Sequence, residues 1–104
     1  MTRLTRRELV ELCEQRYFGG VARENLDAVL DCFTPDALVV IRHGDNPERR
    51  FHGQPAADQQ HLSEFWKHVN GHFVAGFGDF AHYVDAEQQR IASTFVVTLT
   101  PKPG

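Results

Sequence analysis

The sequence lacks several features that define whole classes of protein. It has only two cysteines, Cys13 and Cys32, and they do not form a Cys-x-x-Cys pair. Neither a disulfide scaffold nor a zinc ribbon is therefore indicated, and we expect two reduced, buried thiols. No apolar run approaches the ~20 residues that cross a bilayer. We expect no membrane partner.

Charge is also unremarkable in amount and in distribution. The formal net charge is −3, and the basic clusters at positions 3–7 and 49–50 are too short to form an electrostatic footprint for nucleic acid. We expect no nucleic-acid partner. The first residues are charged rather than apolar, so we expect no signal peptide and a cytoplasmic protein.

Motifs for metals, nucleotides and nucleophiles are missing as well. The six histidines include no His-Glu-x-x-His pattern, and Asn70-Gly71 separates His68 from His72. The run at residues 76–78 has two glycines but no surrounding strand–turn–helix, and no serine nucleophile motif is visible. We expect neither a metal site nor a cofactor.

Aromatic side chains are abundant instead. The 104 residues include eight Phe, and aromatics make up 11% of a chain that has the length of one domain, residues 1–104. Such a content indicates a core or a pocket walled by rings.

Two helices are predicted in the first third of the chain. A capping box at residues 5–8 and apolar residues at 3.6-residue spacing predict a helix over residues 6–18, loosened at its end by Gly19-Gly20. Asn25 is typical of a helix N-cap and begins a second, short helix that Pro35 stops.

A strand and a third helix follow. Residues 37–43 are β-branched and apolar on both faces, which predicts a strand covered on two sides. A polar loop over residues 44–50 leads to a short edge strand at Phe51-His52. We expect Gly53-Gln54-Pro55 to open a third helix, with Pro55 suited to its first turn, and Asn70-Gly71 to close it.

The remaining residues predict an antiparallel hairpin. Residues 72–84 form one long strand in which Gly76 and Gly78 indicate a bulge or bend, and residues 90–100 alternate between two faces after a turn at 85–89. The order α-α-β-α-β-β, with helices before a run of strands, predicts an α+β fold in which three helices pack against a curved antiparallel sheet.

Residues 16–41 resemble the opening of the nuclear transport factor 2-like superfamily, in particular its SnoaL-like and ketosteroid isomerase-like branch. Those proteins begin with a Tyr-bearing helix, a short Leu-Asp-Ala helix and a Phe-x-x-Asp-Ala sequence before the first strand. Tyr17, residues 26–28 and residues 33–37 match that order without a gap. The resemblance covers most of the chain, but its motifs are structural and specify fold better than function.

The resemblance implies a cone-shaped sheet that encloses an apolar pocket, and it implies a homodimer. Two departures bear on these expectations. Ile41 occupies the position of the general-base Asp of the steroid isomerases, and isoleucine cannot accept a proton. Relatives usually continue with another hairpin after the strand ending near Thr100, so we expect a cone that lacks this hairpin or is completed by a second subunit.

Three residues are candidates for catalysis. Tyr17 matches the oxyanion-donating Tyr of the steroid isomerases, and its alternative role is that of a core anchor. His43 shares strand parity with Ile41 and could replace the missing carboxylate, or it could simply lie in solvent. Asp79 lies between Phe77 and Phe80, where rings would raise a carboxyl pKa, unless the bend exposes it. The candidate ligand-binding residues are Cys13, Ile41, Trp66, Phe73, Phe77 and Phe95.

Two functions remain open at this point. The first is binding of a small hydrophobic molecule in the cone pocket, with isomerase, cyclase or lyase chemistry by proton transfer if the protein is an enzyme. The second is a non-catalytic dimeric binding or assembly module of the same fold.

Overall fold

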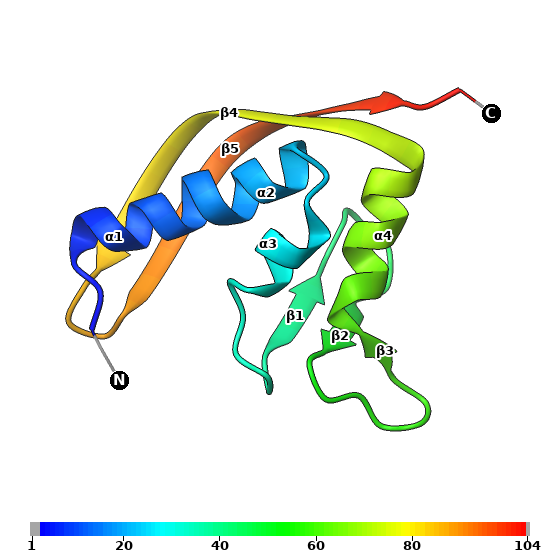
Figure 1. Ribbon diagram of the computed structural model, residues 1–104, viewed down its shortest axis with the longest axis horizontal. Coiled ribbons are helices and arrows are strands. Elements are labelled where there is room, and N and C mark those ends of the chain that lie inside the picture. The colour runs from blue at the N-terminus through cyan, green and yellow to red at the C-terminus, as the bar shows by residue number, and fades with distance from the viewer. Residues whose placement is uncertain (1–2, 104) are drawn as a thin grey trace.

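One long helix begins the chain in the computed structural model, which describes residues 3–103 (Figure 1). It comprises α1 (Arg6–Glu11), a π-helical segment η1 (Leu12–Phe18) and α2 (Gly19–Ala22). The predicted capping box is confirmed: the Glu8 N–H donates to Thr5 Oγ1 at 3.1 Å, and the Thr5 N–H donates to the Glu8 carboxylate at 3.0 Å.

The predicted end of this helix at Gly19-Gly20 is wrong, because Gly20 serves packing rather than termination. A Cβ at Gly20 would lie 3.0 Å from Val29 Cγ2, so glycine lets the next helix approach closely. The helix ends at Ala22, after which Glu24 adopts a φ of 57° and the Asn25 N–H donates to the Gly20 carbonyl at 2.9 Å. This is a Schellman ending with glutamate at the left-handed position.

The second helix, α3 (Leu26–Leu30), begins as predicted and ends early. The Ala28 N–H donates to the Asn25 side chain at 3.1 Å, which confirms the N-cap. The helix stops at Leu30 rather than at Pro35, and turns connect it to the first strand.

Both predicted ends of the third helix are wrong. The helix α4 (Leu62–His72) begins seven residues after Pro55 and continues through Asn70-Gly71. His61 caps it: the Ser63 N–H donates to the His61 ring at 3.1 Å, and the His61 N–H donates to the Glu64 carboxylate at 3.1 Å. At its other end, the chain passes from α4 directly into a strand.

The strands form two sheets rather than the single sheet expected. The first contains β1 (Leu38–Ile41), β2 (Arg49–His52) and β3 (Gln60–His61). The β1–β2 pair is antiparallel and the β2–β3 pair is parallel. Coverage of β1 on both faces is also wrong, since Leu38 and Val40 are 47% and 38% exposed.

A glycine joins this sheet to the segment before it. The Gly53 N–H donates to the Ala37 carbonyl at 2.8 Å, directly after β2. A Cβ at Gly53 would lie 2.2 Å from the Pro35 carbonyl oxygen, so no larger residue fits without backbone movement. Gly53 therefore ends β2 and does not open the third helix.

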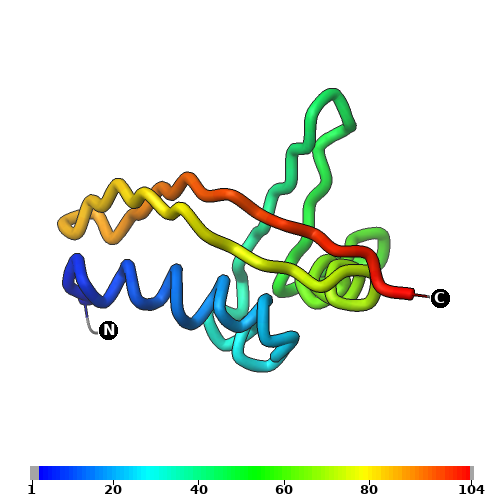
Figure 2. The backbone as a smooth tube through the Cα atoms, turned by 90° about the horizontal axis from the view of Figure 1, so that it is seen from above, coloured from blue at the N-terminus to red at the C-terminus, as the bar shows by residue number. Residues whose placement is uncertain are grey.

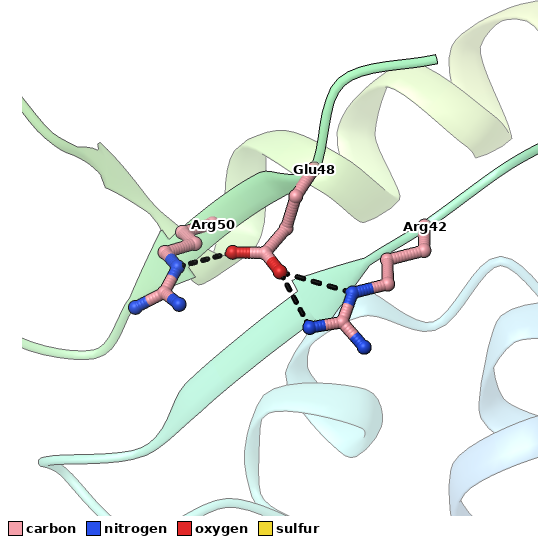
Figure 3. A network of polar contacts seen from close by, with 3 residues as sticks. All are labelled: Arg42, Glu48 and Arg50. Atoms are coloured by element: carbon pink, nitrogen blue, oxygen red, sulfur yellow. Dashed lines mark hydrogen bonds and ion pairs between the residues drawn. The ribbon is translucent and has the colours of Figure 1, made fainter. Parts of the chain in front are cut away.

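Charged side chains tie together the loop between β1 and β2. Glu48 accepts from Arg42 Nε at 2.9 Å and Nη2 at 2.7 Å with one oxygen, and from Arg50 Nε at 2.6 Å with the other (Figure 3). These bonds, with that from Arg50 the largest influence, hold the pKa of the exposed Glu48 carboxyl below its usual range.

The second sheet is the long hairpin of β4 (Phe73–Asp85) and β5 (Arg90–Pro101), close to its predicted limits. It arches over the long helix to the end of α4 (Figure 1), and from above it runs alongside that helix (Figure 2). The predicted bulge is present between Gly78 and Ala81, with Asp79 at a φ of 54°.

The main core lies between the helices and both sheets. Val29 and Phe51 are fully buried and Trp66 is 1% exposed; Val21, Leu62 and Ala75 complete this cluster. Three helices packed against largely antiparallel strands make the fold α+β. No helix within residues 3–103 has the length and apolar character needed to cross a bilayer.

Candidate functional site

An apolar cavity of about 290 Å³ lies where the middle of the hairpin faces the helices. The long helix, β1, α4 and both strands of the hairpin contribute to its wall. The residues that line it are almost all aliphatic or aromatic: Tyr17, Phe18, Val21, Ile41, Phe65, Trp66, Val69, Phe77, Phe95, Val97 and Leu99. Such a lining suits an apolar ligand with few polar groups.

The Tyr17 hydroxyl is the main polar group at this wall. Trp66 Nε1–H donates to Tyr17 Oη at 3.3 Å, and the two rings meet edge to face with centroids 5.9 Å apart. Burial raises the pKa of Tyr17 above that of a free phenol, and the bond from Trp66 only partly opposes this. Tyr17 thus keeps its own hydroxyl hydrogen at neutral pH, and that hydrogen can be donated to a ligand oxygen.

Phe18 is a wall residue that the sequence pattern missed. Its ring centroid lies 4.6 Å from that of Phe95 and 4.9 Å from that of Phe77. In the π-helical segment, the Gly19 N–H donates to the carbonyl of Glu14, five residues earlier. This wider turn brings adjacent Tyr17 and Phe18 to one cavity, which a strict 3.6-residue period does not anticipate.

The cavity brings together five of the nine predicted site residues. Tyr17, Ile41, Trp66, Phe77 and Phe95 all contribute to its wall, although they come from five separate elements. Ile41 offers no proton acceptor there. The structure thus brings five of the predicted residues to one cavity, and Tyr17 is the only one of the three candidate catalytic residues among them.

The other four predicted residues lie elsewhere. His43 is exposed in the loop after β1, and Asp79 is exposed at the bulge beside a shallow depression. Neither residue is part of the cavity wall formed by residues 3–103, and of the two positions considered for His43 the structure has the solvent-exposed one. Phe73 is half-buried at the start of β4, away from this wall. Cys13 lines a separate groove.

That groove is open and apolar, with a volume of about 410 Å³. Its lining includes Cys13, Cys32 and Tyr17. Because Tyr17 also lines the cavity, its side chain lies between the groove and the cavity. The Cys32 thiol donates to the Ala28 carbonyl at 3.3 Å, and burial raises its pKa. Both cysteines are free and half-buried.

A chain of polar side chains near the hairpin turn was also missed. His82 Nε2 lies 2.8 Å from the Glu14 carboxylate, and His82 Nδ1 lies 2.7 Å from Ser93 Oγ. Ser93 Oγ in turn lies 3.6 Å from Cys13 Sγ. The hairpin register pairs His82 with Ser93 directly, so a turn at 85–89 was the signal that could have placed them together.

Comparison with family models, with curated proteins and with solved structures finds no match to this chain. Within residues 3–103, no three His, Cys, Asp or Glu side chains are grouped so that they could hold a metal ion.

Proposed function

We propose that the protein binds a small, largely apolar molecule carrying one hydrogen-bond acceptor, such as a carbonyl oxygen, in the cavity beside Tyr17. The observation that carries this proposal is a half-buried phenol at an otherwise apolar wall. Its oxygen accepts from Trp66, so its hydrogen is directed to another partner. One hydrogen bond in an apolar cavity fixes the orientation of a ligand, while ring contacts supply most of the affinity.

The same arrangement supports membership of the nuclear transport factor 2-like superfamily, in its SnoaL-like branch. Helices of the expected order pack beneath a bent hairpin, and the predicted tyrosine lines the cavity between them. In this proposal the two sheets form facing walls of an open cone. The enzymatic form of the function is isomerase, cyclase or lyase chemistry, in which Tyr17 stabilises a developing oxyanion.

The single tryptophan provides a direct test of binding. Trp66 lines the cavity, so a bound ligand changes its fluorescence. We suggest titration with 2-acetylnaphthalene and 2-ethylnaphthalene, which have similar shapes but differ in the carbonyl oxygen. We expect the ketone to bind about fivefold more tightly, since one hydrogen bond contributes roughly 1 kcal/mol.

Tyr17→Phe is the matched variant for this titration. It keeps the ring and removes the hydroxyl, so the preference for the ketone should disappear while the hydrocarbon still binds. If neither compound changes Trp66 fluorescence, cavity binding is excluded for ligands of this class. An undiminished ketone preference in Tyr17→Phe would exclude the role of the phenol.

Exposed apolar residues favour a second candidate, the dimeric assembly module. Val96, Val97 and Leu99 on β5 and Leu38 and Val40 on β1 are all at least 38% exposed. Exposed apolar groups of this kind are frequent at protein–protein interfaces. Sedimentation equilibrium tests this candidate: a dimer that Val96→Lys dissociates supports it, and a monomer at all concentrations excludes it.

A further inference from the structure

We propose that Cys13 is a nucleophile for acyl transfer, activated through a proton relay formed by Ser93, His82 and Glu14. This site is separate from the ligand cavity and does not depend on the function proposed for it. It joins the long helix to the hairpin, since Cys13 and Glu14 lie on η1, His82 on β4 and Ser93 on β5. The three contacts are 2.8, 2.7 and 3.6 Å, from Glu14 outward to Cys13.

When Glu14 is ionised and His82 is neutral, the chemistry of these groups sets the direction of every hydrogen bond. An ionised Glu14 can only accept, so His82 Nε2 must carry a hydrogen. In a neutral imidazole Nδ1 is then an acceptor, so the Ser93 hydroxyl donates to it. With its hydrogen used in this way, Ser93 Oγ accepts from the Cys13 thiol. All donors thus point from the thiol toward the carboxylate.

This arrangement contains the parts that activate a nucleophile. A base lies within hydrogen-bond distance of a hydroxyl, and a third group orients the base. The His82 side chain is 12% exposed, and its ring stacks on Phe80 at an interplanar angle of 15°, which fixes its orientation. Ser93 lines neither the groove nor the cavity, whereas Cys13 lines the groove. The reacting atom is therefore the sulfur.

The groove indicates the class of substrate. Apart from the two thiols and Tyr17, its lining is aliphatic or aromatic, with Leu9, Leu12, Leu38, Val39 and Ile91 among the contributors. This open apolar groove of about 410 Å³ suits an aliphatic acyl chain. We infer an ester or thioester of such a chain as the substrate.

The reaction balances without a further reagent. The Cys13 sulfur bonds to the acyl carbon as its proton passes to Ser93, the Ser93 proton passes to His82, and the bond to the leaving group breaks. The imidazolium returns its proton through the Ser93 hydroxyl to the leaving alkoxide or thiolate. Water then attacks the acyl-cysteine, the carbon–sulfur bond breaks, and a proton of that water restores the thiol. The products are a carboxylic acid and an alcohol or thiol.

Alkylation by iodoacetamide tests the activation, with Cys32 as an internal control. Both thiols line the same groove, but Cys32 donates to a backbone carbonyl and has no relay behind it. Arg16 and Arg23 lie between them, so trypsin places them on different peptides for mass spectrometry. At about pH 7 we expect Cys13 to react at least about tenfold faster than Cys32.

Substitution of the relay supplies the decisive comparison. Ser93→Ala should lower the Cys13 rate about tenfold or more and leave Cys32 unchanged, whereas Ser93→Thr keeps the hydroxyl and should retain the rate. Glu14→Gln, at a partly exposed position, gives the same test if Ser93→Ala does not fold. Circular dichroism establishes the fold of each variant. A Cys13 rate that equals that of Cys32, or that survives loss of the relay, overturns the proposal.

The acyl step has its own readout. Incubation with p-nitrophenyl hexanoate should give a thioester on the tryptic peptide that contains Cys13, and Cys13→Ser should abolish it while Cys32→Ser does not. Acylation of Ser93 or of Cys32 instead, or no acylation of any residue, overturns the assignment of Cys13 as nucleophile.

Discussion

The two halves of the β4–β5 hairpin face the same long helix with opposite chemistry. On the α4 side of the bulge, Ala75 is buried and Phe77 lines an apolar cavity. On the side of the turn, His82 faces Glu14 and Ser93 in a polar chain, and Tyr83 is 65% exposed. On the α4 side of the bulge the odd-numbered residues of β4 therefore face inward, and on the turn side the even-numbered residues do.

The bulge accounts for this switch. Two residues of β4, Asp79 and Phe80, lie opposite the single residue Phe95 of β5. One extra residue reverses which side chains of the bulged strand face inward, while β5 keeps its alternation. A single local irregularity thus lets one hairpin wall an apolar cavity and also align His82 with Ser93.

The largest effect should come from the apolar half. Trp66→Ala should lower the free energy of unfolding by about 3–5 kcal/mol, because it empties a fully buried site at the centre of the core. Denaturant unfolding measures the change. Val96→Ala, at a position 55% exposed, is the control and should stay within about 0.5 kcal/mol. Equal effects of the two would contradict the position of the core.

The polar half should be less costly to disrupt. His82→Leu should lower the free energy of unfolding by about 1–3 kcal/mol, since it leaves the Glu14 carboxylate and the Ser93 hydroxyl without their partner. Tyr83→Phe alters the neighbouring residue on the exposed face and should be neutral. A neutral His82→Leu, or a costly Tyr83→Phe, would indicate that the inward face of this half is assigned wrongly.

The bulge itself can be tested by side-chain shape. Asp79 has a φ of 54°, which a β-branched residue adopts only at a cost. Asp79→Val should therefore lower the free energy of unfolding by about 1–2 kcal/mol, whereas Asp79→Gly should be neutral or stabilising. Thermal unfolding of the pair is the measurement. If Asp79→Val is as stable as Asp79→Gly, the left-handed conformation at this position is refuted.

The smallest effect on the free energy of unfolding should come from Glu48, in the charged loop between β1 and β2, outside both halves of the hairpin. The Arg50 and Arg42 bonds lower the pKa of Glu48, so its contribution to stability is present above the ordinary glutamate pKa. That contribution is lost as pH falls through the lowered value. Glu48→Gln should thus be slightly less stable at neutral pH and indistinguishable from the original protein in acid. A difference that grows in acid would reverse the sign of this linkage.

Local sequence signals predicted the beginnings of the first two helices and the hairpin. The capping box at residues 5–8 and the Asn25 N-cap are hydrogen-bonding patterns within a few residues, so they can be read without tertiary contacts. The turn at 85–89 likewise fixes the nearby register. Gly76 and Gly78 indicated the bulge, although Asp79 adopts the left-handed conformation.

Features that depend on packing between distant segments were not predictable in the same way. The sequence pattern predicts helix boundaries at Gly20 and Gly53. In the structure each glycine instead allows a close approach, of Val29 to Gly20 and of the Pro35 carbonyl to Gly53. The π-helical turn that places Phe18 at the cavity has no corresponding periodic pattern of apolar residues in the sequence. His43 shows the same limit, because strand parity implied an inward side chain but β1 ends two residues earlier, at Ile41.

In the proposed function, the Tyr17 hydroxyl hydrogen-bonds to the oxygen of a molecule held in the apolar cavity. Isotope-edited infrared spectroscopy of bound ¹³C-carbonyl 2-acetylnaphthalene observes that bond directly. We predict a carbonyl stretch at lower frequency in the original protein than in Tyr17→Phe, where it should match the ketone in an apolar solvent. An identical stretch in the two proteins, with the ketone bound in both, would contradict the account.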